Sequence, residues 1–383
     1  MLLKALSIGG CFIVLAGCAA APPAPLPADL LWQDRAFNYD AALVSVGKRD
    51  LFQLDAGLLS KLHDSGIQNS SAQYRLHYLV SILFGPEAKD FPYSAGHSTI
   101  AAETWRRKRG DCLSLTVLAY SLANALGMSV QMQEVRVPVV FDRRGNVEFL
   151  NRHVNVLVRG AGDLYLIAGS MRSGDVIIDF EPQIASRREG LALSNDGILA
   201  RFYNNLAAEY LAQDDLTLAY AYFKAAVLAD PGYSPSYSNL AQLYTRKGFL
   251  RSAEQLLLHT IALNDDADIA LRSLHQLLVS QGRESEALKY KEIVQDRQYK
   301  DPYYWLGVGL HHLEEGNYQK AVDALERAQD LTRGFQEVHR YLAIAYWRAG
   351  NPIQAKNQLS VLASLMFNDL GFAAPSGENQ QTP

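Results

Sequence analysis

Three residues of the types that cooperate in nucleophilic catalysis follow one another along the chain: Cys112, His153 and Asp179. Cys112 directly precedes an apolar segment with helical spacing, so it is predicted to begin a helix, where unpaired N–H groups and the helix dipole favour a thiolate. His153 lies in one strand-like segment and Asp179 ends another. The imidazole can then act as the base while the carboxylate orients it. The pattern predicts a thiol triad.

The strand predicted around His153 gives it one polar companion. Alternation of faces along a strand places His153 and Asn155 on the same side, opposite Val154 and Val156. Asn155 is therefore a possible supporting residue. Taken singly, these residues have ordinary interpretations, because a lone cysteine in an apolar helix is usually inert core and a lone strand histidine is usually structural. The order and the flanking segments favour the triad.

The elements that must position these residues predict an α+β domain over residues 30–186. Apolar residues recur at helical spacing over 30–90 and from 99 to 126. Helices followed by strands suggest an antiparallel sheet, and 187–195 is expected to be a linker. Short β-rich segments, separated by Gly, Asn and Asp, follow the helices at 129–137, 151–158, 164–168 and 176–180.

Residues 101–114, 150–155 and 178–180 resemble the cysteine, histidine and aspartate segments of the transglutaminase-like superfamily. The resemblance implies a papain-like α+β fold in which Cys112 is the nucleophile, His153 the base and Asp179 the orienting acid. The spacing departs from the family, which often joins the histidine and aspartate strands by a tight turn. Here 26 residues separate His153 from Asp179, which leaves Asp163 and Asp175 as alternatives for the third residue.

Residues 200–369 repeat five times with a period of 34 residues. This pattern resembles the tetratricopeptide repeat, which implies an all-α solenoid that takes a protein or peptide partner in its groove. The third repeat is degenerate, and residues 370–383 are expected to be a disordered tail. With repeats starting at 200, 234, 268, 302 and 336, the twentieth position is alanine every time: Ala219, Ala253, Ala287, Ala321 and Ala355.

The first 17 residues are predicted to be a signal peptide, with Lys4 before an apolar run too short to cross a bilayer. Leu-Ala-Gly-Cys at 15–18 resembles the bacterial lipobox, which implies lipidation of Cys18. Residues 18–29 are then the lipidated cysteine and a Pro-rich spacer. Ala19, in place of the aspartate that resembles an inner-membrane retention signal, favours the outer membrane facing the periplasm. An ordinary signal peptide that happens to contain Cys18 is the alternative.

Composition excludes one class of partner. The 36 basic and 40 acidic residues give a formal charge of −4, without the dense basic field that nucleic acid requires. The densest cationic stretch, 106–109, is typical of a solvated helix end. The repeat histidines lack metal-ligand spacing with cysteine, so we expect neither a metal nor a cofactor. With Cys11 removed and Cys18 lipidated, Cys112 is the only remaining thiol.

Two functions are therefore expected. The first is an enzyme of the cell envelope that cleaves or transfers an amide acyl group through a Cys112 thioester, with the repeats recruiting the substrate. Its superfamily resemblance favours peptidase-like hydrolysis over cross-linking. The alternative is a non-catalytic assembly or interaction lipoprotein, in which the repeats bind a partner and the cysteine domain is structural.

Overall fold

The computed structural model describes residues 26–84, 98–135, 141–144, 147–150, 153–160, 174–180, 190–263, 267–300, 302–331 and 336–369. The candidate signal peptide, Cys18, the strand expected at 164–168, Asp163 and the tail 370–383 lie outside these residues. No helix among the described residues is both long and apolar enough to cross a membrane.

The described part of the chain begins with short helical segments that lead to one central helix. Helix α6 (Cys112–Ala125) is apolar on nearly all sides and is buried over most of its length, as expected of a helix surrounded by other elements. The preceding segments are α1 (Ala28–Leu31), η1 (Asp34–Phe37), η2 (Ala41–Leu43), α2 (Lys48–Phe52), α3 (Ala56–Asp64), η3 (Ile67–Asn69), α4 (Ala72–Phe84) and α5 (Ala101–Arg107).

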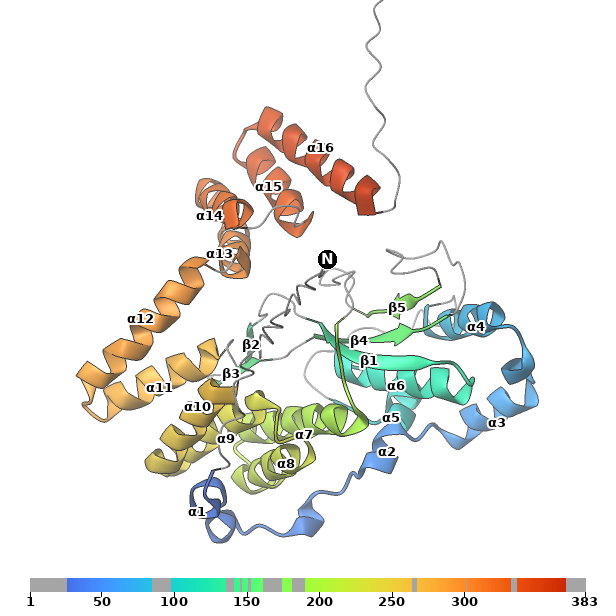
Figure 1. Ribbon diagram of the computed structural model, residues 1–383, viewed down its shortest axis with the longest axis horizontal. Coiled ribbons are helices and arrows are strands. Elements are labelled where there is room, and N and C mark those ends of the chain that lie inside the picture. The colour runs from blue at the N-terminus through green and yellow to red at the C-terminus, as the bar shows by residue number, and fades with distance from the viewer. Residues whose placement is uncertain are drawn as a thin grey trace, which may run out of the picture.

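A four-stranded sheet with the strand order β5-β4-β1-β6 packs beside α6 (Figure 1). Strand β1 pairs antiparallel with β4, with Val135 opposite His153 and Val130 opposite Val158. β2 and β3 form a separate hairpin, which the periodicity does not predict. The strands are β1 (Val130–Val135), β2 (Phe141–Arg144), β3 (Val147–Leu150), β4 (His153–Val158), β5 (Val176–Ile178) and β6 (Leu191–Ala192).

The segment expected to be a linker is partly structured. Within 187–195, Leu191 and Ala192 form β6, which pairs with β1. The linker expectation fails here because a two-residue strand is too short to show alternation. The next helix starts earlier than the repeat pattern predicts, at Asn195, because the Ser194 hydroxyl accepts a hydrogen bond from the Gly197 N–H and caps it.

From Asn195 onward the described chain is a series of helix pairs. Position 20 of every repeat is buried at the contact between the two helices, which explains why each is alanine. The turns between paired helices need a left-handed residue, φ +63° to +84°, at Asp214, Gly248, Gly282, Gly316 and Gly350. The pairs are α7 (Asn195–Ala212) with α8 (Leu216–Ala229), α9 (Ser234–Lys247) with α10 (Leu250–Leu263), α11 (Asp268–Ser280) with α12 (Glu284–Lys300), α13 (Pro302–Glu314) with α14 (Tyr318–Leu331) and α15 (Gln336–Arg348) with α16 (Pro352–Asp369).

The described residues contain two separate hydrophobic cores. One runs without a break from Phe37, through α6 and the sheet, to Ala287 in α12. The other is confined to α13, α14 and α15, from Leu306 to Ala345. In Figure 1 the helix pairs follow an arc from α7 round to α16 that faces the sheet. The first three pairs therefore share a core with the cysteine-containing part, and the last two do not.

The N-terminal segment packs against the repeats, not against the cysteine-containing part alone. Phe37 stacks on Tyr220 of α8, with ring centroids 4.5 Å apart and planes 5° from parallel. The Tyr244 hydroxyl donates to the Leu31 carbonyl at 2.7 Å. Lys224 pairs with Asp34 at 2.7 Å. These contacts join residues 183 to 213 positions apart and fasten the start of the described chain to the first two pairs.

The contact with Lys224 and Tyr220 changes the pKa of the Asp34 carboxyl. Burial raises its pKa, but hydrogen bonds from Lys224 and Tyr220 and the charge of Lys224 outweigh burial, so the pKa lies below its ordinary value. A lowered pKa in the folded state stabilises the fold above the unfolded value of about 3.9. The stabilisation is lost as the pH falls through the lowered folded value.

Asp34→Asn should therefore lower the melting temperature at pH 7 by about 2 °C, because Asp34 is partly exposed and its pair is screened. The difference from the wild type should shrink as the pH falls below about 3.9. Thermal unfolding followed by circular dichroism from pH 7 to pH 3 measures it. Asp29→Asn, an exposed carboxylate in the same segment, is the control. A difference that persists unchanged at pH 3 contradicts this account.

Candidate active site

The imidazole of His153 and the carboxylate of Asp179 lie together in a buried position. His153 Nε2 is 2.8 Å from Asp179 Oδ1 and 2.9 Å from Oδ2. Their side chains are only 2% and 7% exposed. A carboxylate in this position fixes the orientation and tautomer of an imidazole and stabilises its protonated form. The pair has the geometry of a base and the group that orients it.

The sheet register explains why these two residues meet across 26 positions of sequence. Val156 of β4 pairs with Ile178 of β5, which puts Asn155 opposite Asp179, just beyond the end of β5. The Asn155 side-chain amide donates to Asp179 Oδ2 at 3.0 Å, and Asn155 is fully buried. His153 lies two residues earlier on the same face of β4. Asn155 therefore holds the carboxylate that holds the imidazole.

Asp175, one of the two alternatives to Asp179, lies elsewhere. Its carboxylate accepts a hydrogen bond from the Gly160 N–H at 2.9 Å and is 3.8 Å from the Arg159 guanidinium. It therefore stabilises the start of β5 opposite the end of β4 and does not serve His153. Asp163, the other alternative, lies outside the described residues.

Cys112 is the first residue of α6, is partly buried and is in no disulfide. Asp111 is the N-cap, and its Oδ1 accepts from the Ser114 N–H at 2.8 Å. The pattern Asp111-x-x-Ser114 before an apolar run is the sequence signal that could have identified this cap. The start of a capped helix of this length favours a negative charge on the thiol.

The topology brings Cys112 to the same end of the molecule as the His153–Asp179 pair. After α6, a short turn leads into β1, and β4 is antiparallel to β1, so β4 runs in the direction of α6 (Figure 1). The Thr116 hydroxyl donates to the Val154 carbonyl at 3.1 Å. Thr116 is one helical turn after Cys112 on the same face, and Val154 directly follows His153. Helix and strand thus place the three residues at one end.

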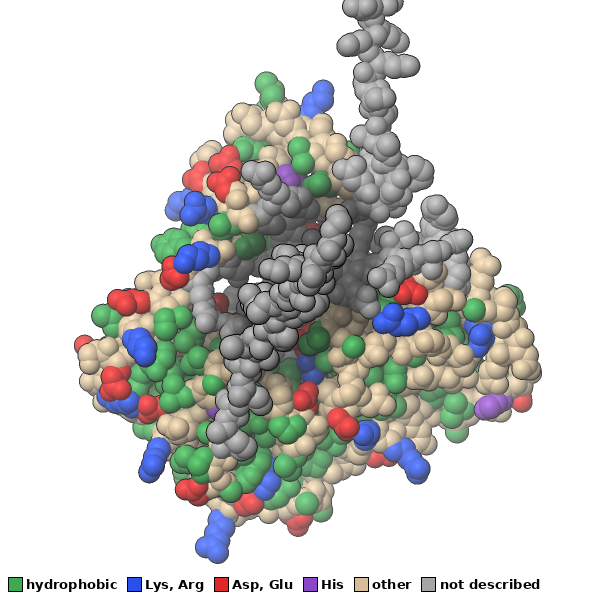
Figure 2. All heavy atoms as spheres, viewed as in Figure 1, with side chains coloured by type: hydrophobic (Ala, Val, Ile, Leu, Met, Phe, Trp, Pro, Cys, Tyr) green, Lys and Arg blue, Asp and Glu red, His purple; other side chains and the backbone are tan. Residues whose placement is uncertain are grey.

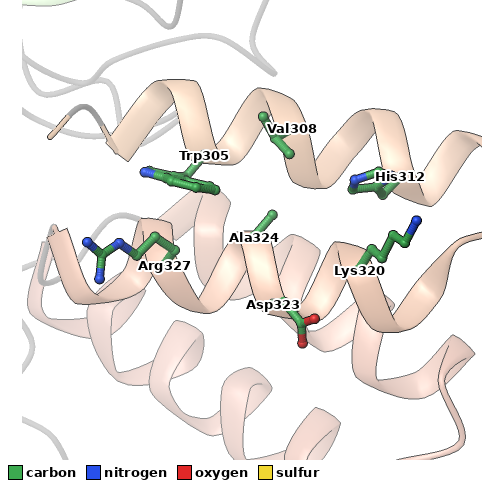
Figure 3. Close-up of a pocket in the computed structure, with 7 residues that line it drawn as sticks. All are labelled: Trp305, Val308, His312, Lys320, Asp323, Ala324 and Arg327. Carbon is green, nitrogen blue, oxygen red and sulfur yellow. The ribbon is translucent and has the colours of Figure 1, made fainter. Parts of the chain in front are cut away.

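A second feature is a groove of about 360 Å³ between α13 and α14 (Figure 3). Trp305, Val308 and His312 extend into it from α13, and Ala324 lies across from them on α14. Two exposed cations, Lys320 and Arg327, lie toward its two ends, and one exposed carboxylate, Asp323, lies nearby.

The groove lies where the first helix of this pair is more exposed than its counterparts in the two preceding repeats. Trp305, Val308 and His312 occupy positions 4, 7 and 11 of their repeat. All three are partly exposed, and His312 keeps 24% of its side-chain surface. The two separate cores meet at this junction. In the two preceding repeats the same positions are covered, at 5% exposure or less: Tyr237, Leu240, Tyr244, Leu271, Leu274 and Leu278.

A tetratricopeptide-repeat family model matches residues 210–278 and 312–369. The C-terminal part of this chain carries tetratricopeptide repeats. The match confirms the repeats predicted from the period and the buried alanines. No curated protein matches the chain.

Among solved structures, MamA 41-end from Desulfovibrio magneticus RS-1 is 17% identical, with a TM-score of 0.25, over 44% of this chain and 96% of that one. YrrB, a tetratricopeptide-repeat protein with an unusual peptide-binding site, is 17% identical with a TM-score of 0.25, over 43% and 86%. The APC/C hetero-tetramer Cut9–Hcn1 is 18% identical with a TM-score of 0.25, over 45% and 34%.

The charged and metal-ligating side chains form no patch of a single sign on the face shown in Figure 2 and no metal-binding group within the described residues. On that face (Figure 2), coloured basic and acidic side chains are intermixed, in keeping with the small net charge. Within the described residues, no group of three or more His, Cys, Asp or Glu side chains is arranged to hold a metal ion.

If Cys112 and His153 act as a pair, His153→Ala should slow alkylation of Cys112 by iodoacetamide at pH 6 by about tenfold or more, because the thiolate loses its imidazolium. Asp179→Asn should slow it less. Mass spectrometry of the Cys112 peptide measures the rate. His339→Ala is the matched control, since His339 is also buried and hydrogen-bonded, to Gln358 at 2.7 Å. Equal alkylation rates in wild type and His153→Ala would show that His153 does not activate the Cys112 thiol.

Proposed function

We propose that this protein binds a partner protein through its repeats, and that the partner inserts an acidic amphipathic helix into the groove of the fourth repeat. The observation that carries this proposal is the uncovered set of positions 4, 7 and 11 there. In the two preceding repeats the packing of the helix pairs buries these positions, so a helix has the shape that fits here. Recognition by helix-in-groove docking uses apolar anchors of this kind.

Charge complementarity identifies the helix as acidic. Lys320 and Arg327 lie toward the two ends of the groove and outweigh the single carboxylate of Asp323. Opposite charges on a partner would steer it and fix its orientation, while the indole of Trp305 supplies the buried anchor.

A designed amphipathic helix with a glutamate-rich polar face should bind, and its lysine-rich counterpart should bind much more weakly. Lys320→Glu together with Arg327→Glu should weaken the acidic helix by about tenfold or more, and Trp305→Ala should weaken it similarly. Fluorescence anisotropy of the labelled helices measures affinity. Arg251→Glu, which reverses an exposed cation on α10, is the control. Equal binding of both helices, or no effect of the double reversal, would overturn the assignment.

A second function is favoured by one specific observation, the buried contact between His153 and Asp179. We infer that Cys112, His153 and Asp179 form a transglutaminase-like thiol site for acyl transfer. The Cys112 thiolate attacks an amide carbonyl carbon and forms the S–C bond. The amide C–N bond then breaks as His153 gives its proton to the leaving amine, which leaves a thioester. Water or an amine releases the acyl group, with hydrolysis favoured.

Two further proposals concern how the chain is divided into units and where the protein is located in the cell envelope. We propose that 30–186 and 200–369 are two sequence units, and that the first three helix pairs of the second share a hydrophobic core with the first. Lipidation of Cys18 would hold the protein on the outer membrane facing the periplasm. If Cys18 is lipidated, the docking of the segment from Leu31 to Phe37 on the first two repeats would keep these repeats close to the lipid.

The thiol function predicts a covalent intermediate. Treatment with p-nitrophenyl acetate should release p-nitrophenol in a burst and leave an acetyl thioester on Cys112, which mass spectrometry of the peptide detects. Cys112→Ala should abolish the thioester, and His153→Ala should reduce the burst rate by about a hundredfold. Asp179→Asn should reduce it less, since the base and nucleophile remain. An unmodified Cys112 in the wild type, or equal acetylation in His153→Ala, would leave the partner-binding function as the only one.

A further inference from the structure

A chain of buried hydrogen bonds joins the first repeat to the start of α6. Ser98 is its central residue and is only 2% exposed. The Ser98 N–H donates to Glu209 Oε1 of α7 at 3.1 Å. The Asn205 side-chain amide, also on α7, donates to Ser98 Oγ at 3.0 Å. Ser98 Oγ in turn donates to Asp111 Oδ2 at 2.5 Å. Two residues of α7 thus hold Ser98, Glu209 through its N–H and Asn205 through its hydroxyl, and that hydroxyl binds the cap residue of the Cys112 helix.

The other oxygen of Asp111 is equally engaged. Its Oδ1 accepts from the Ser114 N–H at 2.8 Å and from the Ser114 hydroxyl at 2.5 Å. Ser114 Oγ also accepts from the Thr99 N–H at 2.8 Å. Asp111 is 7% exposed and Ser114 is fully buried. Because water contributes little here, these donors set both the position of the carboxylate and the strength of its field.

That field acts directly on Cys112, the next residue. A carboxylate disfavours ionisation of a neighbouring thiol, and donors that bind the carboxylate weaken this effect. Other titratable groups near the start of α6 are Lys108 and Arg109, which precede it in the sequence, and Glu209 of α7, which accepts from the Ser98 N–H. The topology brings His153 and Asp179 to the same end of α6. Of the donors on Asp111, Ser98 is the one held by a repeat helix.

From these contacts we propose that the first repeat sets the reactivity of Cys112, with Asn205, Glu209 and Ser98 as positioning residues for the nucleophile. The proposal rests on the thiol function proposed above and adds its regulation. A ligand that moves α7 shifts Ser98, and the Asp111 cap follows. Movement can reach α7 from the second repeat, because Arg246 of α9 donates to the Leu211 carbonyl at 2.7 Å.

The test compares neighbouring asparagines in the full chain. Asn205→Ala and Ser98→Ala should slow iodoacetamide alkylation of Cys112 at pH 6 by about threefold to tenfold and move the midpoint of the pH–rate profile upward. Ser98→Thr, which keeps the hydroxyl, should restore most of the rate. Asn204→Ala should match the wild type, because Asn204 is buried and hydrogen-bonded but contacts Asn239 instead of Ser98. The Cys112 peptide is followed by mass spectrometry.

Amide hydrogen exchange of residues 111–115 gives a second readout that needs no chemistry at the thiol. Exchange should accelerate in Asn205→Ala and Ser98→Ala and stay unchanged in Asn204→Ala. Unaltered alkylation in both variants overturns the proposal, as does an equal change in Asn204→Ala. Ordinary thiol reactivity in the wild type, with no effect of His153→Ala, would instead reject the acyl-transfer function. Even then, comparing the alkylation rate and amide exchange of the Ser98 variants with those of the wild type would test whether the first repeat controls the start of α6.

Discussion

A carboxylate buried to the extent of Asp111 must be surrounded by donors, because an ionised group without hydrogen bonds is strongly unfavourable in an apolar environment. Its own helix supplies the donors from Ser114, and the last one, Ser98, is held by α7. The start of α6 is therefore complete only when the first repeat is packed against it. The sequence indicates a division of the chain at about residue 190. Packing has no boundary there, because one hydrophobic core extends across it.

The same packing also covers the apolar face of the first repeat. A solenoid stacks each unit on its neighbours, and its first unit leaves an apolar face that must be covered. Here the cysteine-containing part and the N-terminal segment both cover it. The Arg201 guanidinium of α7 donates to the Glu134 carboxylate of β1 at 3.0 Å, a buried pair that orients the repeat on the sheet. Phe37 stacks on Tyr220 from the other direction. The non-repeat part of the chain is thus the cap of the solenoid.

Sequence periodicity is sufficient to predict structure that depends on residues close together in the sequence. It predicts the helix that begins at Cys112, the strand that carries His153, the strand that Asp179 directly follows, and the repeats with an alanine at position 20. It misses contacts such as Lys224 with Asp34 and Ser98 with Glu209, because periodicity indicates which face is buried and not which polar groups meet. The pairing of Asn155 with Asp179 needed the sheet register, which a 26-residue connection leaves open.

The two cores assign different roles to different repeats. A helix bound in the groove of the fourth repeat would occupy the face that an earlier helix pair would otherwise cover, next to the junction between the cores. Because packing is not continuous across that junction, such a partner would be bound without affecting Cys112 through contacts. A ligand that touches the first three repeats would act on the core that contains α6. Recruitment and control of reactivity would then reside in separate halves of the solenoid, linked along the chain by α12 and α13.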